Sequence, residues 1–326
     1  MTRFFANANY DFIGVRRYAY ILTALLIIPG LLFTLIAGLN YSIEFTGGTM
    51  LQVKPNKPLN VGALRAELDA QGLQGAEIQS FGSANEYVIR ARVAKAGTDA
   101  NDTQAMSDLV SAALDKVVGK GQYTVGRGAA VGPKVGGELR TKAFLAIFLS
   151  FFAVLAYLAY RFEWRFGVAA VVATAHDILA TIAFIGIMRM EVSLTVVAAV
   201  LSMVGYSLND TIIIFDRVRE NLVRMRSASF AEILNRSVNE TLPRSILTHG
   251  TSLGTLLALS VFGGEVIRPF ALVMFFGVFT GTFSSIYIAS PVLMAIEKRW
   301  PGPHTHARKP RATAPTTAPR KAQPVT

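Results

Sequence analysis

Two aspartates lie inside stretches that are otherwise apolar enough to sit in lipid. Asp210 falls within the apolar run 192–215, and Asp177 lies about eleven residues into the run 166–188. A carboxylate in a hydrophobic span costs about 2.5–3.5 kcal/mol on insertion scales, so such a residue usually serves transport or a proton relay. The alternative is a structural carboxyl group that ties two helices together by a hydrogen bond.

Arg244 is the basic residue best placed to meet Asp210. The run 192–215 is expected to cross toward the cytoplasm and the run 245–262 to cross outward. Asp210 and Arg244 then both lie in the inner half of the bilayer, whereas Asp177 is about 16 Å deep, near the midplane. Burial and a nearby positive charge act in opposite directions on a carboxyl group, so small movements can switch its proton binding.

Small and hydroxyl-bearing side chains recur at helical spacing around these charges. The hydroxyls predict a polar seam that either conducts protons or holds helices together. The glycine pairs form GxxxG patterns, which predict close helix packing. The residues are Thr174, Thr181, Ser207, Thr248, Thr251, Ser252 and Thr255, with the pairs Gly250/Gly254 and Gly277/Gly281.

Other chemistry has little support in the sequence. His176 and His249 could titrate near neutral pH and are candidates for the same relay. No cluster of His, Asp and Glu has metal-ligand spacing, and no phosphate loop or Ser/His/Asp constellation is present. The chain has no cysteine. We therefore expect no metal, no cofactor and no enzymatic activity.

Composition indicates a polytopic membrane protein. Of 326 residues, 52% are hydrophobic and only 16% are charged, which is too apolar for an ordinary soluble protein of this length. The formal charge of +11 falls in short segments between apolar runs and near the C-terminus, so topology and anionic lipid explain it better than nucleic acid does. Six spans are predicted, over 18–39, 143–160, 166–188, 192–215, 245–262 and 270–296.

The distribution of arginine predicts the orientation of these spans. Positive residues are expected to stay in the cytoplasm, and here they precede the first span and follow the second and fourth. Both termini are then cytoplasmic. The residues are Arg3, Arg16, Arg17, Arg161, Arg165, Arg217, Arg219, Arg224, Arg226 and Arg236, against Arg189 and Arg268 in the outer loops.

The segment 40–140 has the character of a folded α+β domain. Strands are expected over 49–54, 76–81, 86–93 and 123–131, with helices capped by Asn60 and Asp102 between them. This βαββαβ order is that of a ferredoxin-like domain. It follows a helix that begins in the cytoplasm, so we expect it in the periplasm. Its flanking glycine pairs, Gly47/Gly48 and Gly136/Gly137, are expected to be flexible joints.

The predicted organisation has four parts. Residues 1–39 form a cytoplasmic N-terminus and the first transmembrane helix, 40–140 the periplasmic domain, and 141–298 transmembrane helices two to six. Residues 299–326 are rich in Pro, Thr, Ala, Lys and Arg and have no apolar periodicity, which is typical of a disordered basic cytoplasmic tail. A docking peptide is the alternative for this tail.

Six motifs in the chain, taken together and in order, resemble the SecD/SecF family of protein-export membrane proteins. The resemblance covers about residues 10–298. The motifs are IEFTGGT at 43–49, VGPKVGGEL at 131–139, AHD at 175–177, GYSLNDTIIIFDRVREN at 205–221, LPRSILT at 242–248 and GTFSSIY at 281–287.

The resemblance implies half of a transporter of the resistance-nodulation-division type, with six transmembrane helices and a periplasmic domain between helices one and two. It implies pairing with a separate SecD chain, and action with the SecYEG channel and the SecA ATPase in the bacterial inner membrane. The proton gradient would help to move a preprotein outward. In this family the acid of the Asn209-Asp210 motif and the arginine at position 244 belong to the proton pathway, and Asp177 is carried over as a relay or conformational residue.

Two other functions remain open from the residues alone. A small-molecule or lipid exporter of the same superfamily would need an apolar pocket, and the outer domain is small for one. A purely structural membrane scaffold would tolerate replacement of both buried charges, because a buried pair is often neutral against apolar residues.

Overall fold

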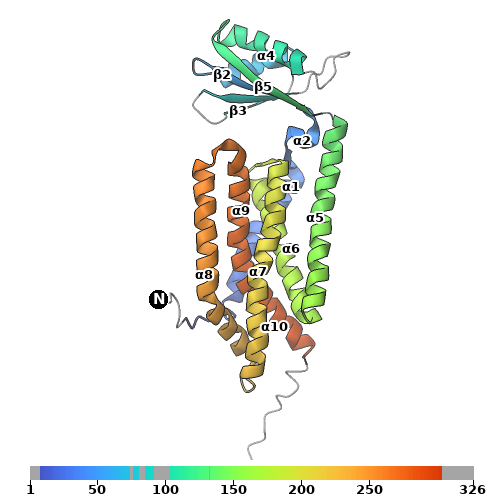
Figure 1. The fold of residues 1–326 in the computed structure, drawn as a ribbon, viewed down its shortest axis with the longest axis vertical. Coiled ribbons are helices and arrows are strands. Elements are labelled where there is room, and N and C mark those ends of the chain that lie inside the picture. The colour runs from blue at the N-terminus through green and yellow to red at the C-terminus, as the bar shows by residue number, and fades with distance from the viewer. Residues whose placement is uncertain (1–7, 74–75, 81–84, 92–102, 132, 303–326) are drawn as a thin grey trace, which may run out of the picture.

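The structure is a computed structural model that describes residues 8–73, 76–80, 85–91, 103–131 and 133–302. A bundle of long helices carries a small α+β domain at one end, and the described chain ends at the opposite end of the bundle (Figure 1). We call these the domain end and the terminal end.

The α+β domain has the predicted ferredoxin-like order. Its sheet runs β3-β4-β2-β5 with antiparallel neighbours, so the first and last strands of the domain lie side by side. The two helices pack on one face of the sheet. The elements are β2 (Gly48–Pro55), α3 (Val61–Ala70), β3 (Glu77–Ser80), β4 (Tyr87–Ala91), α4 (Thr103–Val117) and β5 (Tyr123–Val131).

Local sequence signals account for these elements. Asn60 caps α3 by accepting a hydrogen bond from the backbone N–H of Ala63 at 3.1 Å, as predicted. Leu64 and Leu68, one turn apart, are both fully buried and pack against the apolar side of α4. The predicted cap Asp102 lies outside the described residues.

The described chain contains six helices long and apolar enough to cross a membrane, so the predicted number of spans is confirmed. The last crossing changes from α-helix to π-helix and back. The elements are α1 (Arg16–Ala37), α5 (Pro133–Arg161), α6 (Trp164–Ile187), α7 (Leu194–Arg224), α8 (Phe230–Phe262) and the continuous α9 (Gly264–Ser284), η1 (Ser285–Ala289) and α10 (Ser290–Arg299).

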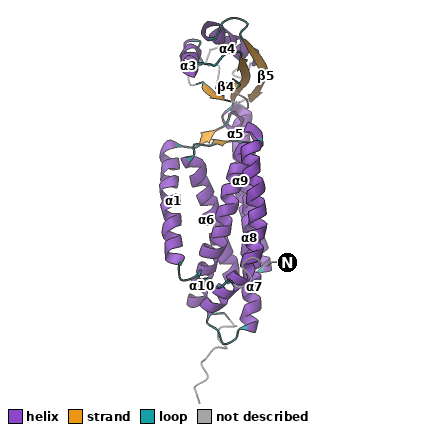
Figure 2. Ribbon diagram, turned by 90° about the vertical axis from the view of Figure 1, so that its left-hand side faces the viewer, coloured by secondary structure: helices purple, strands orange, loops and turns teal. Residues whose placement is uncertain are grey.

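The helices differ in how far they are buried. α6, α7 and the α9–α10 crossing form the core, whereas α1 and α5 lie at the periphery (Figure 2). Gly277 and Gly281 of α9 permit the close approach of α7, because a Cβ on either would fall within 3 Å of Met203 or Ser207. The predicted packing role of this glycine pair is confirmed.

Short elements join the domain to the bundle. β1 (Asn40–Tyr41) pairs in parallel with β6 (Glu191–Val192), and α2 (Ile43–Thr46) follows. An ion pair of 2.8 Å joins Arg90 of the domain to Glu191. A carboxylate oxygen of Glu44, Oε2, accepts a hydrogen bond of 2.7 Å from the backbone N–H of Leu194, the first residue of α7.

The two glycine pairs differ from the prediction that both are flexible joints. Gly47 and Gly48 have φ of 72° and 139°, where glycine is favoured. Gly136 and Gly137 instead lie within α5, and a Cβ on Gly136 would be 2.9 Å from the backbone nitrogen of Gly47. Gly136 therefore makes a close helix contact, whereas a Cβ on Gly137 would meet no atom within 4 Å; the sequence spacing could not distinguish this helix from a loop.

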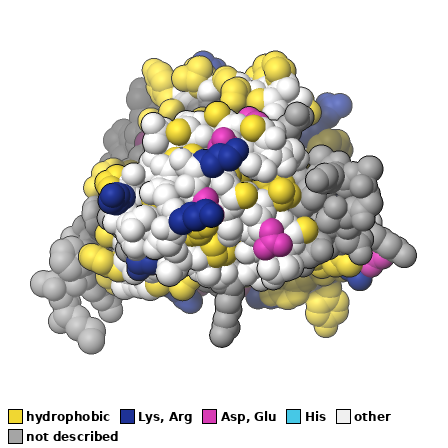
Figure 3. Space-filling view, turned by 90° about the horizontal axis from the view of Figure 1, so that it is seen from above, with side chains coloured by type: hydrophobic (Ala, Val, Ile, Leu, Met, Phe, Trp, Pro, Cys, Tyr) yellow, Lys and Arg dark blue, Asp and Glu magenta, His cyan; other side chains and the backbone are white. Residues whose placement is uncertain are grey.

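Among the described residues, the surface of the domain end carries no large block of one charge. Seen from above, Lys and Arg side chains alternate with Asp and Glu side chains and with apolar ones (Figure 3). Two of the cations are paired, Lys54 with Glu86 at 2.6 Å and Lys116 with Glu67 at 2.5 Å.

Candidate proton-relay site

Asp177 is fully buried in the core of the bundle, on α6. Its Oδ2 accepts hydrogen bonds from the hydroxyls of Ser207 on α7, at 2.5 Å, and Ser284 on α9, at 2.7 Å. Its Oδ1 lies 3.0 Å from Nδ1 of the adjacent His176. Three helices thus meet at one carboxyl group, which is compatible both with a proton-relay residue and with a structural carboxyl group that ties helices together.

Asp210, on α7, has only half of its carboxyl group satisfied. The residue is 1% exposed, and its Oδ1 accepts a hydrogen bond of 2.5 Å from the hydroxyl of Ser245 on α8. Its Oδ2 is buried and has no hydrogen-bond partner among the described residues. An unpartnered buried carboxyl oxygen is costly, so this atom marks a place where a proton or another group can be accepted.

The predicted pairing of Asp210 with Arg244 is not formed in the single chain. Arg244 is exposed on α8, and within the described residues it makes no ion pair with Asp210. Successive helical residues point about 100° apart, so Ser245 takes the inward position that was expected for Arg244. Asn209 is likewise exposed, one position from the buried Asp210.

Ser245 and Ser284 were therefore missed as partners of the two acids. The spacing of the hydroxyls indicated polar helix faces, but not which side of each helix faces inward. In α8 the predicted seam of Thr248, Thr251 and Thr255 is exposed, and the inward face carries Ser245 and His249 instead.

The π-helix η1 lies directly beside these polar contacts. Thr211, next to Asp210, shares a hydrogen bond of 2.8 Å with the hydroxyl of Ser285, the first residue of η1. The hydroxyl of Ser290 donates to the carbonyl of Ser285 at 3.1 Å, five residues earlier across the same turn. π-Bulges within α-helices frequently accompany functional sites.

Two family models match the chain. The model described as protein export membrane protein SecD/SecF, C-terminal, matches residues 110–299, and the SecD/SecF GG motif matches residues 33–59. The chain belongs to the SecD/SecF family. The GG motif match contains Gly47 and Gly48, so the glycines between α2 and β2 are a feature of this family.

Individual SecD/SecF proteins are similar over nearly the whole chain. A protein translocase subunit SecF from Gemmatimonas aurantiaca is 54% identical over 92% of this chain and 91% of its own length. The SecF subunit of Escherichia coli O157:H7 is 34% identical over 88% of each. The crystal structure of SecDF from Thermus thermophilus, titled a translocon-associated membrane protein, superposes with a TM-score of 0.79 at 34% identity and covers 90% of this chain and 39% of that one.

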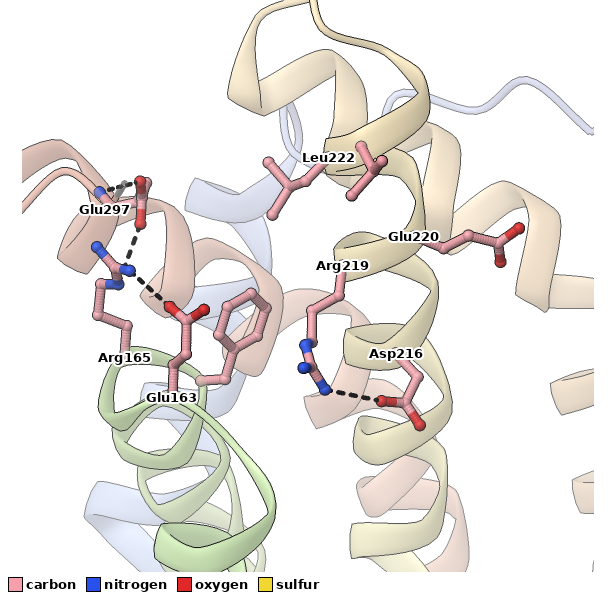
Figure 4. Close-up of a pocket in the computed structure, with 10 residues that line it drawn as sticks. Glu163, Arg165, Asp216, Arg219, Glu220, Leu222 and Glu297 are labelled. Atoms are coloured by element: carbon pink, nitrogen blue, oxygen red, sulfur yellow. Dashed lines mark hydrogen bonds and ion pairs between the residues drawn. The ribbon is translucent and has the colours of Figure 1, made fainter. Parts of the chain in front are cut away.

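The SecD/SecF bundle also has a charged cavity, of about 430 Å³, at its terminal end. Arg165, which is nearly buried, lies between Glu163 at 2.6 Å and Glu297 at 3.5 Å, and Arg219 points toward Asp216 (Figure 4). These charges compensate one another, and neither Asp177 nor Asp210 lines this cavity. Among the described residues, no group of three His, Cys, Asp or Glu side chains could hold a metal ion.

Proposed function

We propose that this chain is a subunit of the bacterial protein-export machinery that works with a separate SecD chain. The pair uses the proton motive force to promote translocation of preproteins across the cytoplasmic membrane, together with the SecYEG channel and the SecA ATPase. The observation that carries the proposal is Asp210, a buried acid in a membrane-spanning helix whose second carboxyl oxygen has no partner in the part of the chain that the structure describes. Such a group suits repeated uptake and release of a proton.

The exposed polar face of α7 and α8 supports a partner chain. Asn209, Arg244 and Thr248 would all face hydrocarbon if the single chain were surrounded by lipid, which is unfavourable. Gly250 and Gly254 on the same helix have no heavy atom within 4 Å of a Cβ position, so another helix can approach closely there. SecD covers this face in our proposal, and Arg244 then completes the relay with Asp210.

The orientation follows from the charges at the terminal end. Arg161, Arg217 and Arg219 lie at that end of the bundle, and positive residues favour the cytoplasmic side. The α+β domain is then periplasmic and both termini are cytoplasmic, in a multi-pass protein of the inner membrane. The proposed direction of proton movement is from the domain end to the terminal end.

The junction offers a route from the relay to the domain. α7 carries Asp210 and the partner of Asp177, Ser207. The first N–H of α7 is held by Glu44, which precedes the glycine joint at Gly47. A displacement of α7 on protonation therefore acts on the base of the domain, and the pair Gly47/Gly48 is the proposed pivot.

The test is preprotein export into inverted membrane vesicles that contain SecD and either this chain or its Asp210→Asn form. We expect Asp210→Asn to abolish only the part of export that depends on the proton gradient. Asp216→Asn is the matched control, because Asp216 lies in the same helix but is exposed in an ion pair with Arg161 at 3.0 Å. If export by Asp210→Asn depends on the proton gradient as the wild type does, the proposal is refuted and a structural scaffold is favoured.

A further inference from the structure

His249 is a second buried group with an unsatisfied atom, and it lies next to Asp210. It is 4% exposed, and its Nδ1 has no hydrogen-bond partner among the described residues. α7 and α8 run antiparallel, with Asp210 bonded to Ser245 and, one turn nearer the domain end, Tyr206 against His249 with ring centroids 5.5 Å apart. Ser245 and His249 are four residues apart in α8 and lie on the same side of the helix, so His249 faces α7 one turn along from Asp210.

The surroundings of His249 leave few other groups for its proton. On α7 the neighbours are Tyr206 and Asp210, and on α8 the nearest ionisable residue in the chain is Arg244, which precedes Ser245. α9 has no ionisable residue between Arg268, near its start, and its end at Ser284. The hydroxyl of Tyr206 donates to the carbonyl of Thr248 at 3.4 Å and contacts the hydroxyl of Ser252, which lies nearer the domain end than His249.

A purely structural histidine would not be expected in this state. A buried ring nitrogen without a partner is unfavourable, and so is a buried carboxyl oxygen without one. Among the described residues, both kinds of atom are left unsatisfied on adjacent helices instead of being replaced by apolar groups. Imidazole is also the side chain that exchanges protons near neutral pH.

We propose that His249 is the relay residue through which Asp210 receives protons from the domain end of the membrane. The imidazolium form gives one proton to the Asp210 carboxylate, which leaves a neutral ring and a neutral carboxylic acid. The ring then regains a proton from the domain-side solution, by way of the hydroxyls of Tyr206 and Ser252. This inference rests on the proposed proton-driven function and adds the route by which the proton arrives.

The test uses the complex with SecD in inverted vesicles, whose lumen corresponds to the domain side. Gradient-dependent export is measured against lumenal pH for the wild type, His249→Ala, His249→Gln and Asp210→Asn. We expect both histidine variants to lose about 10²-fold in the gradient-dependent rate, the lower end for a positioned proton-transfer group. The pH response should flatten, and imidazole in the lumen should restore His249→Ala but not Asp210→Asn.

The controls separate this inference from the proposed function. Thr23→Val removes a hydroxyl of the peripheral helix α1 that donates to the carbonyl of Tyr20 at 3.1 Å, and it should leave export unchanged. Normal export by His249→Gln overturns the inference, as does a slow His249→Ala with an unchanged pH profile and no response to imidazole. Normal gradient dependence in Asp210→Asn instead overturns the proposed function.

Discussion

Replacement of Asp177 tests how the three core helices are held together. The perturbation is Asp177→Ala, which removes the acceptor shared by Ser207 and Ser284. Asp177→Asn places an amide carbonyl oxygen where Oδ2 lies, and this oxygen can still accept hydrogen bonds from both hydroxyls. We expect Asp177→Ala to be markedly less stable than the wild type and Asp177→Asn to differ little.

The magnitude follows from what each serine does when its acceptor is gone. Ser284 also donates to the carbonyl of Gly281 at 3.1 Å and so retains a partner, whereas Ser207 has no second acceptor among its hydrogen bonds in the described structure. Interhelical hydrogen bonds in membranes contribute only about 0.6 kcal/mol on average, so their direct loss is minor. The orphaned hydroxyl of Ser207 dominates, and the free energy of unfolding should fall by about 1–3 kcal/mol.

The assay is equilibrium unfolding of the chain in mixed micelles, followed by tryptophan fluorescence. The two tryptophans, Trp164 and Trp300, lie in edge contact with centroids 5.9 Å apart at the ends of α6 and α10, so their emission reports the separation of these two helices on unfolding. Adding Ser207→Ala to Asp177→Ala should recover most of the loss, because donor and acceptor are then both absent. An additive loss in the double variant would refute the reasoning.

Two further predictions concern packing and pH. Gly281→Ala places a Cβ 2.8 Å from that of Ser207 and should lower the free energy of unfolding in the same assay by about 1–3 kcal/mol. Gly254→Ala is the control, because no atom lies within 4 Å of its Cβ position, and it should be neutral or stabilising. Equal effects of the two substitutions would contradict this packing. The hydrogen bond from Lys116 lowers the pKa of Glu67 below its ordinary value of 4.5. The stabilisation of the domain by the Glu67 carboxylate is therefore present above pH 4.5 and is lost as the pH falls through the lowered pKa. The thermal unfolding temperatures of the wild type and of Glu67→Gln should then converge in acid. A constant difference between them at all pH values would exclude this ion pair as the cause.

Much of the local structure of this chain could be predicted from the sequence because it depends on neighbouring residues. The predicted strand 123–131 has the same limits as β5. The predicted cap Asn60 stands directly before α3 and caps it. The six spans follow from hydrophobic length alone. The helices nevertheless extend beyond the predicted spans, as α8 begins at Phe230 and not near Ser245, because a helix continues into water where its residues permit it.

The sequence by itself determined that two acids are buried in apolar helices and that serines and threonines lie near them. Only the tertiary structure decided which partners they have: Ser207 bonds to Asp177 and not to Asp210, and Ser245 rather than Arg244 reaches Asp210. The physical reason is that periodicity defines the faces of a helix, whereas packing between helices defines the rotation that turns one face inward. A difference of one residue, about 100°, separates the buried Ser245 from the exposed Arg244.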